Sequence, residues 1–198
     1  MTARCKTIAV FDFDGTITRH DSFARFVKTT LSTPRFYLGI CKQMPRLVAY
    51  KLGWLSNSYA KEALFGSYFR GMPAIEFKTA GIEFASEIDK MLRPDTMDTL
   101  RAHAYAGHTI YIVSASMPQW IEPWAISHGV TKVIGTEPET NCGGLLTGKF
   151  ATPNCYGAEK VKRFLAEEPD RESYRLVAYG DSRGDREMLA EADEPHLV

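Results

Sequence analysis

The sequence has few cysteines, and they do not form the pattern of a metal-binding or disulfide-stapled protein. No CxxC pair occurs, and the cysteines are spread widely along the 198 residues. This spacing argues against a zinc site and against a dense disulfide framework. We therefore expect reduced thiols, as in a cytoplasmic protein, at the four positions Cys5, Cys41, Cys142 and Cys155.

The chain also lacks a long hydrophobic run and an excess of charge of one sign. No stretch of about 18 uncharged apolar residues occurs, and the apolar run in the N-terminal sequence MTARCKTIAVFDFDG is too short for a secretory signal. The 24 basic residues equal the 24 acidic ones in number, so the overall charge suggests neither nucleic-acid binding nor disorder. We expect a soluble, cytoplasmic, globular protein with no nucleic-acid partner.

Short, β-branched apolar segments predict the strands of a buried sheet. Residues 7–13 form one such segment, and similar ones follow at 109–113, 132–134 and 176–179. Helical stretches separate the last three, and this alternation predicts an α/β fold with a Rossmann-like parallel sheet. Ligands of such sheets bind beyond the carboxyl ends of the strands.

Residues 22–93 interrupt this alternation, because they carry helix signals only. We predict an all-helical cap over 22–93, inserted into an α/β core that is formed by 1–21 and 94–198. Pro45 is expected to kink or divide the second helix of this cap. Turn residues between 137 and 150 favour a hairpin in the second part of the core.

Two aspartates, Asp12 and Asp14, end the first predicted strand. Residues two apart in a strand point to the same side, so both carboxylates are expected at the ligand edge of the sheet. Like charges this close raise each other's pKa unless a cation lies between them, and all-oxygen ligands of this kind suit Mg²⁺. An acidic pair at a strand end can also be a plain solvated turn.

A second acidic pair, Asp181 and Asp185, follows the last predicted strand. Asp185 stands where it could merely cap the helix that comes next. Asp181 lies before that helix and is not explained in this way. This pair is therefore a second candidate set of carboxylates at the ligand edge of the sheet.

A hydroxyl and a cation are expected at the same edge. Ser114 follows the strand 109–113, and the hydroxyl and backbone N–H groups of Ser114 and Ala115 could hold an anion. Ser116 is expected to be the N-cap of the next helix. Lys160 stands in a first helical turn, where a positive charge is unfavourable unless an anion lies near. Two acidic pairs, a hydroxyl and a lysine together predict a phosphoryl-transfer site.

The segments FDFDGTIT, VSAS, the helix of Lys160 and GDSRGD resemble, in this order, the four motifs of the haloacid dehalogenase-type hydrolases. The helical insertion and the stretch GGLLTGKFATPNCYGAEKV resemble the phosphoserine-phosphatase-like branch of that superfamily. The resemblance spans nearly the whole chain. It implies a magnesium-dependent phosphatase that hydrolyses a phosphate monoester through an aspartyl-phosphate.

The resemblance also implies a role for each motif residue. The nucleophile of the family falls on Asp12, and its general acid and base falls on Asp14. The residues that bind the phosphate fall on Ser114, Ala115 and Lys160. The implied Mg²⁺ site consists of Asp12, the backbone carbonyl of Asp14, Asp181 and, in support, Asp185.

Departures from the branch leave the substrate open. Gly15 stands where phosphoserine phosphatases commonly carry serine, and GDSRGD replaces their GDGxND. Asp21 matches the acidic residue that recognises the amino group of phosphoserine in that branch. An aspartate just before Ser22 is equally well explained as a helix N-cap.

The predicted cap is strongly basic, although the whole chain is neutral. Residues 22–75 contain eight basic residues against one acidic residue, together with ten aromatic rings. Most of these rings are expected in the cap's own core, with a solvated basic face. The alternative is contact with an anionic membrane or a partly apolar anionic substrate, so a phospholipid headgroup phosphate stands beside a phosphorylated small molecule as a candidate substrate.

Other functions are compatible with parts of the pattern. A signalling receiver also groups aspartates, a hydroxyl and a lysine around Mg²⁺, but it needs neither a helical insertion nor an acid two residues after its phosphorylated aspartate. A non-catalytic regulatory relative would not need intact Asp12, Asp14, Lys160 and Asp181. A phosphotransferase would use the same residues, because an aspartyl-phosphate can pass to an alcohol as well as to water.

Overall fold

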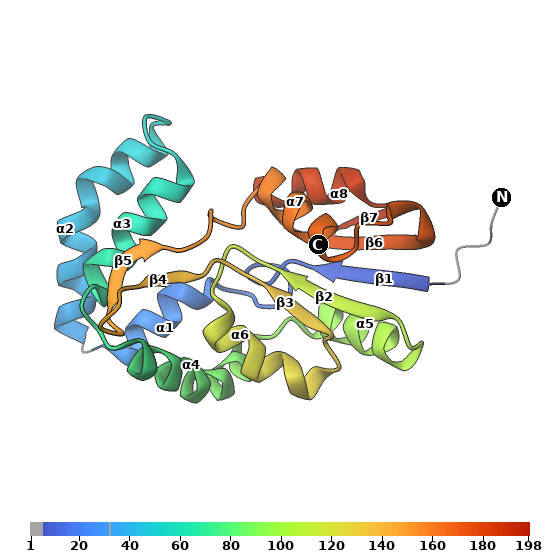
Figure 1. Cartoon of the computed structure of the whole chain (residues 1–198), viewed down its shortest axis with the longest axis horizontal. Coiled ribbons are helices and arrows are strands. Elements are labelled where there is room, and N and C mark those ends of the chain that lie inside the picture. The colour runs from blue at the N-terminus through green and yellow to red at the C-terminus, as the bar shows by residue number, and fades with distance from the viewer. Residues whose placement is uncertain (1–5, 32) are drawn as a thin grey trace.

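The computed structural model describes residues 6–31 and 33–198, and it contains the predicted parallel sheet. Five parallel strands form this sheet in the order β3-β2-β1-β6-β7 (Figure 1). The predicted α/β fold is therefore confirmed. The strands are β1 (Lys6–Phe11), β2 (Thr109–Val113), β3 (Lys132–Ile134), β6 (Tyr174–Gly180) and β7 (Glu194–Leu197).

Alternate side chains of β1 pack into two different hydrophobic clusters. Ile8 and Val10 pack on one face of the sheet with residues of α7 (Ala158–Glu167) and α8 (Arg186–Glu191). Ala9 and Phe11 pack on the other face with residues of α5 (Pro94–Tyr105) and α6 (Pro118–Ala125). The sheet is thus covered by helices on both faces (Figure 1), as its continuous apolar strands require.

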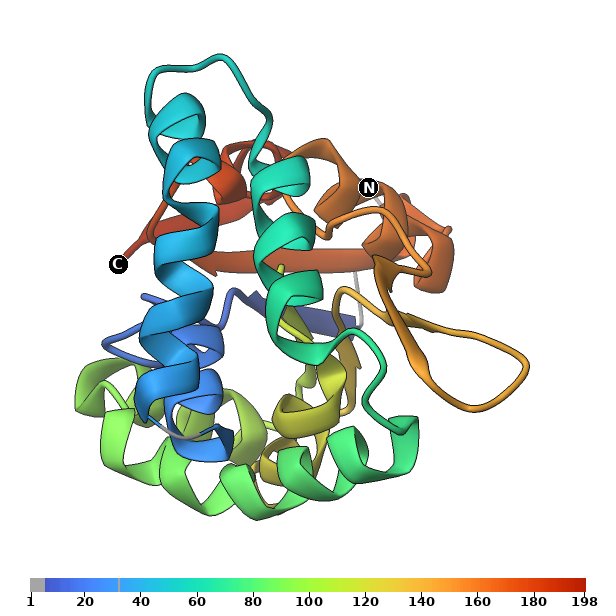
Figure 2. The same ribbon diagram turned by 90° about the vertical axis from the view of Figure 1, so that its left-hand side faces the viewer.

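Helices α1 to α4, which follow β1 in the chain, fall within the segment 22–93 for which the sequence predicts a cap, and we call this segment the cap. In the view of Figure 2, α2 and α3 run side by side in front of the rest of the molecule. Gly53 lies in the turn between them with φ +78°, a value that favours glycine. The helices are α1 (Ser22–Thr30), α2 (Thr33–Lys51), α3 (Asn57–Phe69) and α4 (Ala74–Ile88).

Pro45 does not divide α2. The helix continues from Thr33 to Lys51 with Pro45 inside it. Proline removes one backbone hydrogen bond, and packing of α2 against α3 stabilises the continuous helix. The prediction that Pro45 divides the helix is therefore wrong, and the alternative of a kink at Pro45 stays a prediction.

The aromatic residues of the cap do not form a separate core. Phe26 of α1 stacks on Trp120 of α6 with ring centroids 4.6 Å apart, and Phe69 and Phe77 join the same cluster. This cluster continues to Phe11 in the sheet. Burying an aromatic side chain of this size stabilises a fold by about 1.5–3 kcal/mol, so the cap is anchored on the sheet layer by shared hydrophobic contacts.

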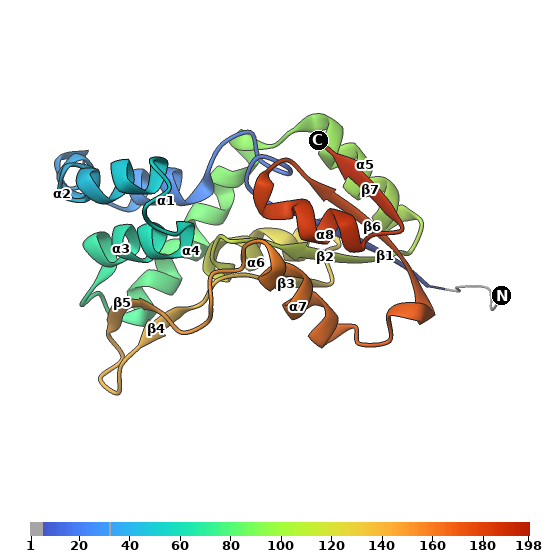
Figure 3. The ribbon, with the colours of Figure 1, turned by 90° about the horizontal axis from the view of Figure 1, so that it is seen from above.

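A hairpin from the second half of the chain packs against the cap. The strands β4 (Pro138–Thr140) and β5 (Leu146–Phe150) pair antiparallel, which confirms the predicted hairpin. Figure 3 shows the hairpin beside α3, and β5 contacts that helix. The division into 1–21 with 94–198 and 22–93 stays a prediction, and this hairpin shows that the cap also contacts residues from outside 22–93.

Two local features differ from the sequence-based expectation. The N-cap of α6 is Met117 rather than Ser116, because the helix begins one residue later, at Pro118. The edge strand β7 was not predicted, since Glu194, Pro195 and His196 give it no apolar pattern. Proline is tolerated in such a strand because an edge strand leaves one row of N–H groups unpaired.

Candidate active site

The predicted site residues meet at the carboxyl ends of three neighbouring strands. Asp12 and Asp14 follow β1, Ser114 follows β2, and Asp181 follows β6. A cavity of about 360 Å³ lies at this edge, between the sheet and the cap. Among its lining residues are Asp12, Asp14, Asp21, Lys61, Ser114, Ala115, Lys160 and Asp185.

Lys160 reaches this edge from the first turn of α7 and joins two aspartates. Its Nζ lies 2.5 Å from Oδ1 of Asp12 and 2.6 Å from Oδ1 of Asp185. The lysine is only 3% exposed. Burial alone would lower the pKa of Lys160, but the two carboxylates outweigh burial and raise this pKa above its usual value. Lys160 is therefore held as a cation at the site.

Asp12 is buried and lines the cavity. Burial raises the pKa of Asp12 to about 7, against the opposing effect of the Lys160 cation. The nearby carboxylates of Asp185 and Asp14 raise it further. The site therefore concentrates negative charge that favours the approach of a cation.

Asp14 is held by two serines that the sequence did not single out for this role. Its Oδ1 accepts a hydrogen bond of 2.7 Å from the backbone N–H of Ser22, and its Oδ2 accepts a short one from the hydroxyl of Ser116. Burial, followed by the charge of Asp21, raises the pKa of Asp14 to about 6. A carboxyl group with this pKa can both give and take a proton near neutral pH.

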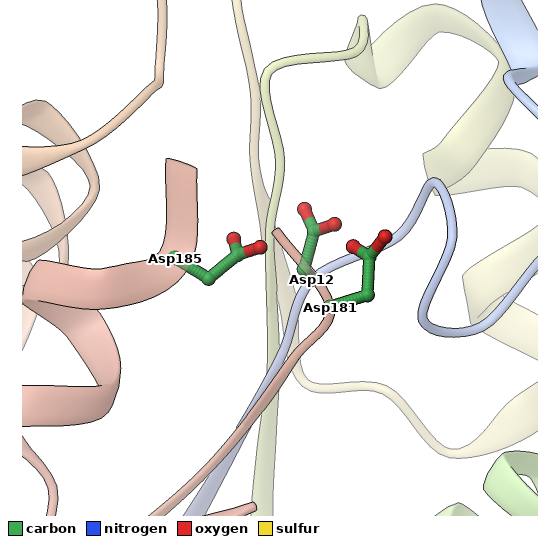
Figure 4. Close-up of side chains that lie close together, drawn as sticks. All are labelled: Asp12, Asp181 and Asp185. Atoms are coloured by element: carbon green, nitrogen blue, oxygen red, sulfur yellow. The ribbon is translucent and has the colours of Figure 1, made fainter. Parts of the chain in front are cut away.

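Three carboxylates are close enough to bind a metal ion together. Asp12, Asp181 and Asp185 each offer an oxygen within 4.8 Å of the others, and Figure 4 shows the three groups around one space. Oxygen ligands in this number suit Mg²⁺. The described residues of this edge therefore fit the metal that the family resemblance implies.

The two aspartates of the fourth motif differ in their surroundings. Asp185 uses its Oδ2 to accept hydrogen bonds from the backbone N–H and the hydroxyl of Ser182, at 3.0 and 2.7 Å, while its Oδ1 is bound to Lys160. Asp181 accepts a weak hydrogen bond from Thr16 at 3.4 Å. Burial, and then the charge of Asp185, raises the pKa of Asp181. Within the described residues, the carboxylate of Asp181 therefore has fewer hydrogen-bond and ion-pair partners than that of Asp185.

The glycine that departs from the phosphoserine phosphatase pattern has a geometric reason. Gly15 has φ +90°, a backbone conformation that favours glycine. A Cβ atom at this position would lie 2.2 to 2.8 Å from the carboxylate atoms of Asp181. Gly15 therefore makes room for the carboxylate where the acidic cluster lies.

The loop after β2 presents both polar groups that the sequence predicts. The hydroxyl of Ser114 accepts a hydrogen bond of 3.0 Å from the N–H of Ser116, so its own hydrogen remains available to another acceptor. Among the described residues, no hydrogen bond is formed by the backbone N–H of Ala115. These two groups are suited to bind an anion in the cavity.

Sequence reasoning missed Lys61, which enters the same cavity from α3 of the cap. Its Nζ donates a hydrogen bond of 2.9 Å to the backbone carbonyl of Ala115. Burial lowers the pKa of Lys61, while the charges of Asp21 and Asp14 oppose this change. No local signal marks Lys61, because its partners lie on elements that are distant in sequence.

Asp21 has the helix-capping role, which is one of the two explanations that the sequence left open. It is the N-cap of α1, because its Oδ1 accepts a hydrogen bond of 2.8 Å from the N–H of Ala24. Asp21 also lines the cavity. The capping role is thus observed, and contact with a substrate stays a prediction.

The fold and the four motif segments together define a haloacid dehalogenase-like hydrolase. The model of that family matches residues 9–190, so the chain belongs to it. This match confirms the family, and with it the expectation of a hydrolytic enzyme. Within the described residues, no helix has the length and apolar character needed to cross a membrane.

Particular relatives share most of this chain. Protein CicA of Caulobacter vibrioides is 34% identical over 188 residues, which cover 94% of this chain and 83% of CicA. A histidinol-phosphatase of Neisseria meningitidis is 26% identical over 214 aligned residues, which cover 98% of this chain and 90% of that protein.

Solved structures show the same fold at lower identity. A protein of unknown function from Bordetella pertussis superposes with a TM-score of 0.78 at 24% identity, covering 97% of this chain and 89% of the other. A substrate-bound phosphoserine phosphatase superposes with a TM-score of 0.64 at 16% identity, covering 96% and 84%. The predicted likeness to the phosphoserine-phosphatase-like branch is therefore confirmed for the fold.

Proposed function

We propose that this protein is a magnesium-dependent phosphatase that hydrolyses a phosphate monoester through an aspartyl-phosphate on Asp12. The observation that carries the proposal is the placement of Lys160 between Asp12 and Asp185, with Asp14 and Ser114 lining the same cavity. Membership of the hydrolase family and the resemblance to a histidinol-phosphatase support the same reaction class.

The first step is attack by Asp12. One of its carboxylate oxygens forms a bond to the phosphorus, and the bond between phosphorus and the substrate oxygen breaks. Asp14 gives its proton to the departing alkoxide, which leaves as an alcohol. The hydroxyl of Ser114, the N–H of Ala115 and the ammonium of Lys160 bind the phosphate oxygens during the transfer.

The second step regenerates the enzyme. Asp14, now a carboxylate, takes a proton from a water molecule, whose oxygen attacks the phosphorus of the aspartyl-phosphate. The bond between phosphorus and Asp12 breaks, so that inorganic phosphate and a free Asp12 carboxylate result. The raised pKa of Asp14, about 6, is suited to these opposite roles.

Magnesium would be held by Asp12, Asp181 and the backbone carbonyl of Asp14. Bound there, it would neutralise charge on the phosphate and on the acidic cluster. Asp185 supports the site from behind, because its oxygens are bound to Lys160 and Ser182. Lys160 supplies a second, permanent positive charge at the nucleophile.

The substrate of this proposal is a phosphorylated small molecule. Asp21 lies at the cavity and lowers the free energy of a positively charged group there, so a substrate amine is the group that it would contact. The rest of the substrate would lie under the cap, against residues of α3. We also assign 22–93 to this cap and 1–21 with 94–198 to the catalytic core.

A second candidate substrate is the phosphate of an anionic lipid headgroup. The observation that favours it is an exposed apolar stripe on α2, because Tyr37, Met44 and Val48 follow one another at helical spacing and are exposed, on a helix that carries four basic residues. Trp54, just beyond this helix, is 77% exposed. Among the described side chains of α2, the exposed large apolar ones are Tyr37, Leu38, Met44, Val48 and Tyr50.

The deciding experiment measures phosphate release from a panel of small phosphomonoesters and lipid phosphates, with Mg²⁺ and with excess chelator. The wild type should turn over at least one substrate in Mg²⁺ only, and Asp12→Asn should abolish turnover. Asp98→Asn, which changes an exposed carboxylate on α5, is the matched control and should remain active. Near wild-type activity of Asp12→Asn, or undiminished activity in chelator, would overturn the proposal.

The same assay separates hydrolysis from transfer. With an added alcohol acceptor, a phosphotransferase would form a new phosphate ester at the expense of inorganic phosphate, whereas a phosphatase would release the phosphate to water. A regulatory relative without catalysis would release no phosphate from any member of the panel.

A further inference from the structure

A second cavity lies in the cap, separated from the candidate active site by α3. It has a volume of about 540 Å³, is open to solvent on one side and is lined by residues of α2, α3 and β5 and by Arg70. Opposite faces of α3 line the two cavities: Lys61 and Leu64 line the active-site cavity, and Ala63 and Gly66 line this one. Figure 2 shows α2 and α3 side by side. We call it the cap cavity.

Four basic side chains from three different elements line the cap cavity. Lys42 and Arg46 come from α2, Arg70 follows α3, and Lys149 comes from β5. Glu62 is the one acidic residue in this lining, and its Oε2 already accepts a hydrogen bond of 2.9 Å from the backbone N–H of Phe150. The cap cavity therefore carries an excess of positive charge.

These cations have no counterion in the part of the chain that the structure describes. There, the side chains of Lys42, Arg70 and Lys149 form no ion pair and no hydrogen bond, and Arg46 donates to the neutral amide of Gln43 at 2.7 Å. Like charges gathered around a hollow repel one another. An anion in the cap cavity would remove this repulsion.

The wall of the cap cavity is fixed by close backbone contact. A Cβ atom on Gly66 would lie 2.7 Å from the carbonyl oxygen of Gly148, so α3 and β5 approach each other more closely than larger residues permit. Gly148 also has φ +83°, which favours glycine. On the side of α2, Gln43 is 5% exposed and holds Arg46 in place. The segments that carry Arg70 and Lys149 are thus held close together.

We propose that the cap cavity is a second binding site, for a ligand that carries at least two phosphate charges. Arginine binds phosphate oxygens through paired N–H groups, and lysine adds a compact charge, so two residues of each kind suit a polyvalent phosphate. The ligand is either a soluble polyphosphate or the headgroup of an anionic phospholipid. This site is independent of the reaction proposed for Asp12.

The test follows backbone amides by NMR while pyrophosphate is added to the full chain in chelator. Resonances of Gly66 and Gly148 report on the cap cavity, and those of Ala115 and Gly184 report on the active site. We expect the first pair to shift and saturate. In the double variant Lys42→Gln/Arg70→Gln, the pyrophosphate affinity derived from the Gly66 and Gly148 resonances should fall at least about tenfold. The reason is that each substitution removes a charge-assisted hydrogen bond to the ligand.

The control removes two charges from the cap outside the cavity, as Lys28→Gln/Lys78→Gln. It should leave the affinity at Gly66 and Gly148 within about twofold of the wild type, because exposed charges at a distance are screened. Equal weakening in both double variants would mean that only the general charge of the cap attracts pyrophosphate, and it would overturn the site. Shifts confined to Ala115 and Gly184 would overturn it as well, unless the lipid experiment shows binding.

Vesicles distinguish the two sources of phosphate. Sedimentation is compared for phosphatidic acid in phosphatidylcholine and for phosphatidylcholine alone. Binding to the acidic vesicles that is lost in Lys42→Gln/Arg70→Gln but kept in the control assigns the site to a lipid headgroup. Saturable pyrophosphate binding without such sedimentation assigns it to a soluble ligand. Absence of both results overturns the proposal, whatever the phosphatase assay shows.

Discussion

The candidate active site and the cap cavity differ in the burial and in the ion pairing of their lysines. At the sheet edge, Lys160 is 3% exposed and lies against two carboxylates. In the cap cavity, Lys42 and Lys149 are exposed and form no ion pair within the described residues. An unpaired buried charge costs several kcal/mol, whereas a solvated one costs little. Burial therefore decides which cations need a partner from the chain itself.

The strongest test of this comparison is the removal of one lysine from each place. Lys160→Met leaves Asp12 and Asp185 close together without their cation, and we expect a loss of about 3–5 kcal/mol in unfolding free energy. Lys42→Met should change it by less than about 0.5 kcal/mol. Urea unfolding in chelator, followed by circular dichroism, measures both. Similar losses for the two variants would contradict the comparison.

Substitution of Asp14 tests whether this buried acid at the sheet edge also has a chemical role. Asp14→Asn cannot protonate a leaving group, so we expect a loss of about 10²–10⁴-fold in kcat for alkyl phosphates. Activated aryl phosphates need less protonation and should lose less. Unfolding curves and Mg²⁺ titration of the variant exclude lost folding or metal affinity. An equal loss on both substrate types would argue against the acid role.

Lys61 lies between the two regions, because it belongs to the cap but enters the active-site cavity. Lys61→Met removes its hydrogen bond to Ala115 and its charge from the substrate cavity. We expect KM for the phosphorylated substrate to rise about tenfold, the value of one charge-assisted hydrogen bond, with kcat little changed. Lys78→Met, on the exposed side of α4, is the control. A fall in kcat at constant KM would instead place Lys61 in the chemical step.

The residues of the sheet edge were predictable because their signals are local. Asp12, Asp14 and Asp181 each follow a recognisable strand, and parallel strands bring their carboxyl ends to one edge. The same rule placed Ser114. Lys160 was predictable because a lysine is out of place in a first helical turn.

Other features of the fold depend on contacts between distant segments. Ser22 donates to Asp14, and Lys61 donates to the carbonyl of Ala115, 54 residues away. The cap shares its aromatic cluster with the sheet layer through Phe26 and Trp120. Local periodicity contains no information on which distant rings meet, so the sequence predicted that the cap had a core of its own.

Burial also favours the neutral form of a histidine. The resulting pH dependence of stability is the smallest of the effects that we expect. Burial, and then the charge of His108, lowers the pKa of His103 below the usual value of 6.5. Its ring nitrogens lie 2.7 Å from Nδ1 of His108 and 2.9 Å from the hydroxyl of Tyr179, while Glu194 and His196 act on it from the edge strand. His103 thus resembles Asp12 in that its environment disfavours the charged form.

The sign of the pH effect follows from this direction. As the pH falls through 6.5, the unfolded chain takes up a proton at residue 103 before the folded chain does, so the stability that His103 contributes is present above this pH and is lost below it. Because His103 is only half-buried, the loss should be small. Urea unfolding at pH 7.5 and 5.5 should therefore show a smaller decrease for His103→Gln than for the wild type, with the exposed His20→Gln as control. An equal decrease in all three proteins would show that burial at this position does not disfavour the charged ring, unlike burial at Asp12.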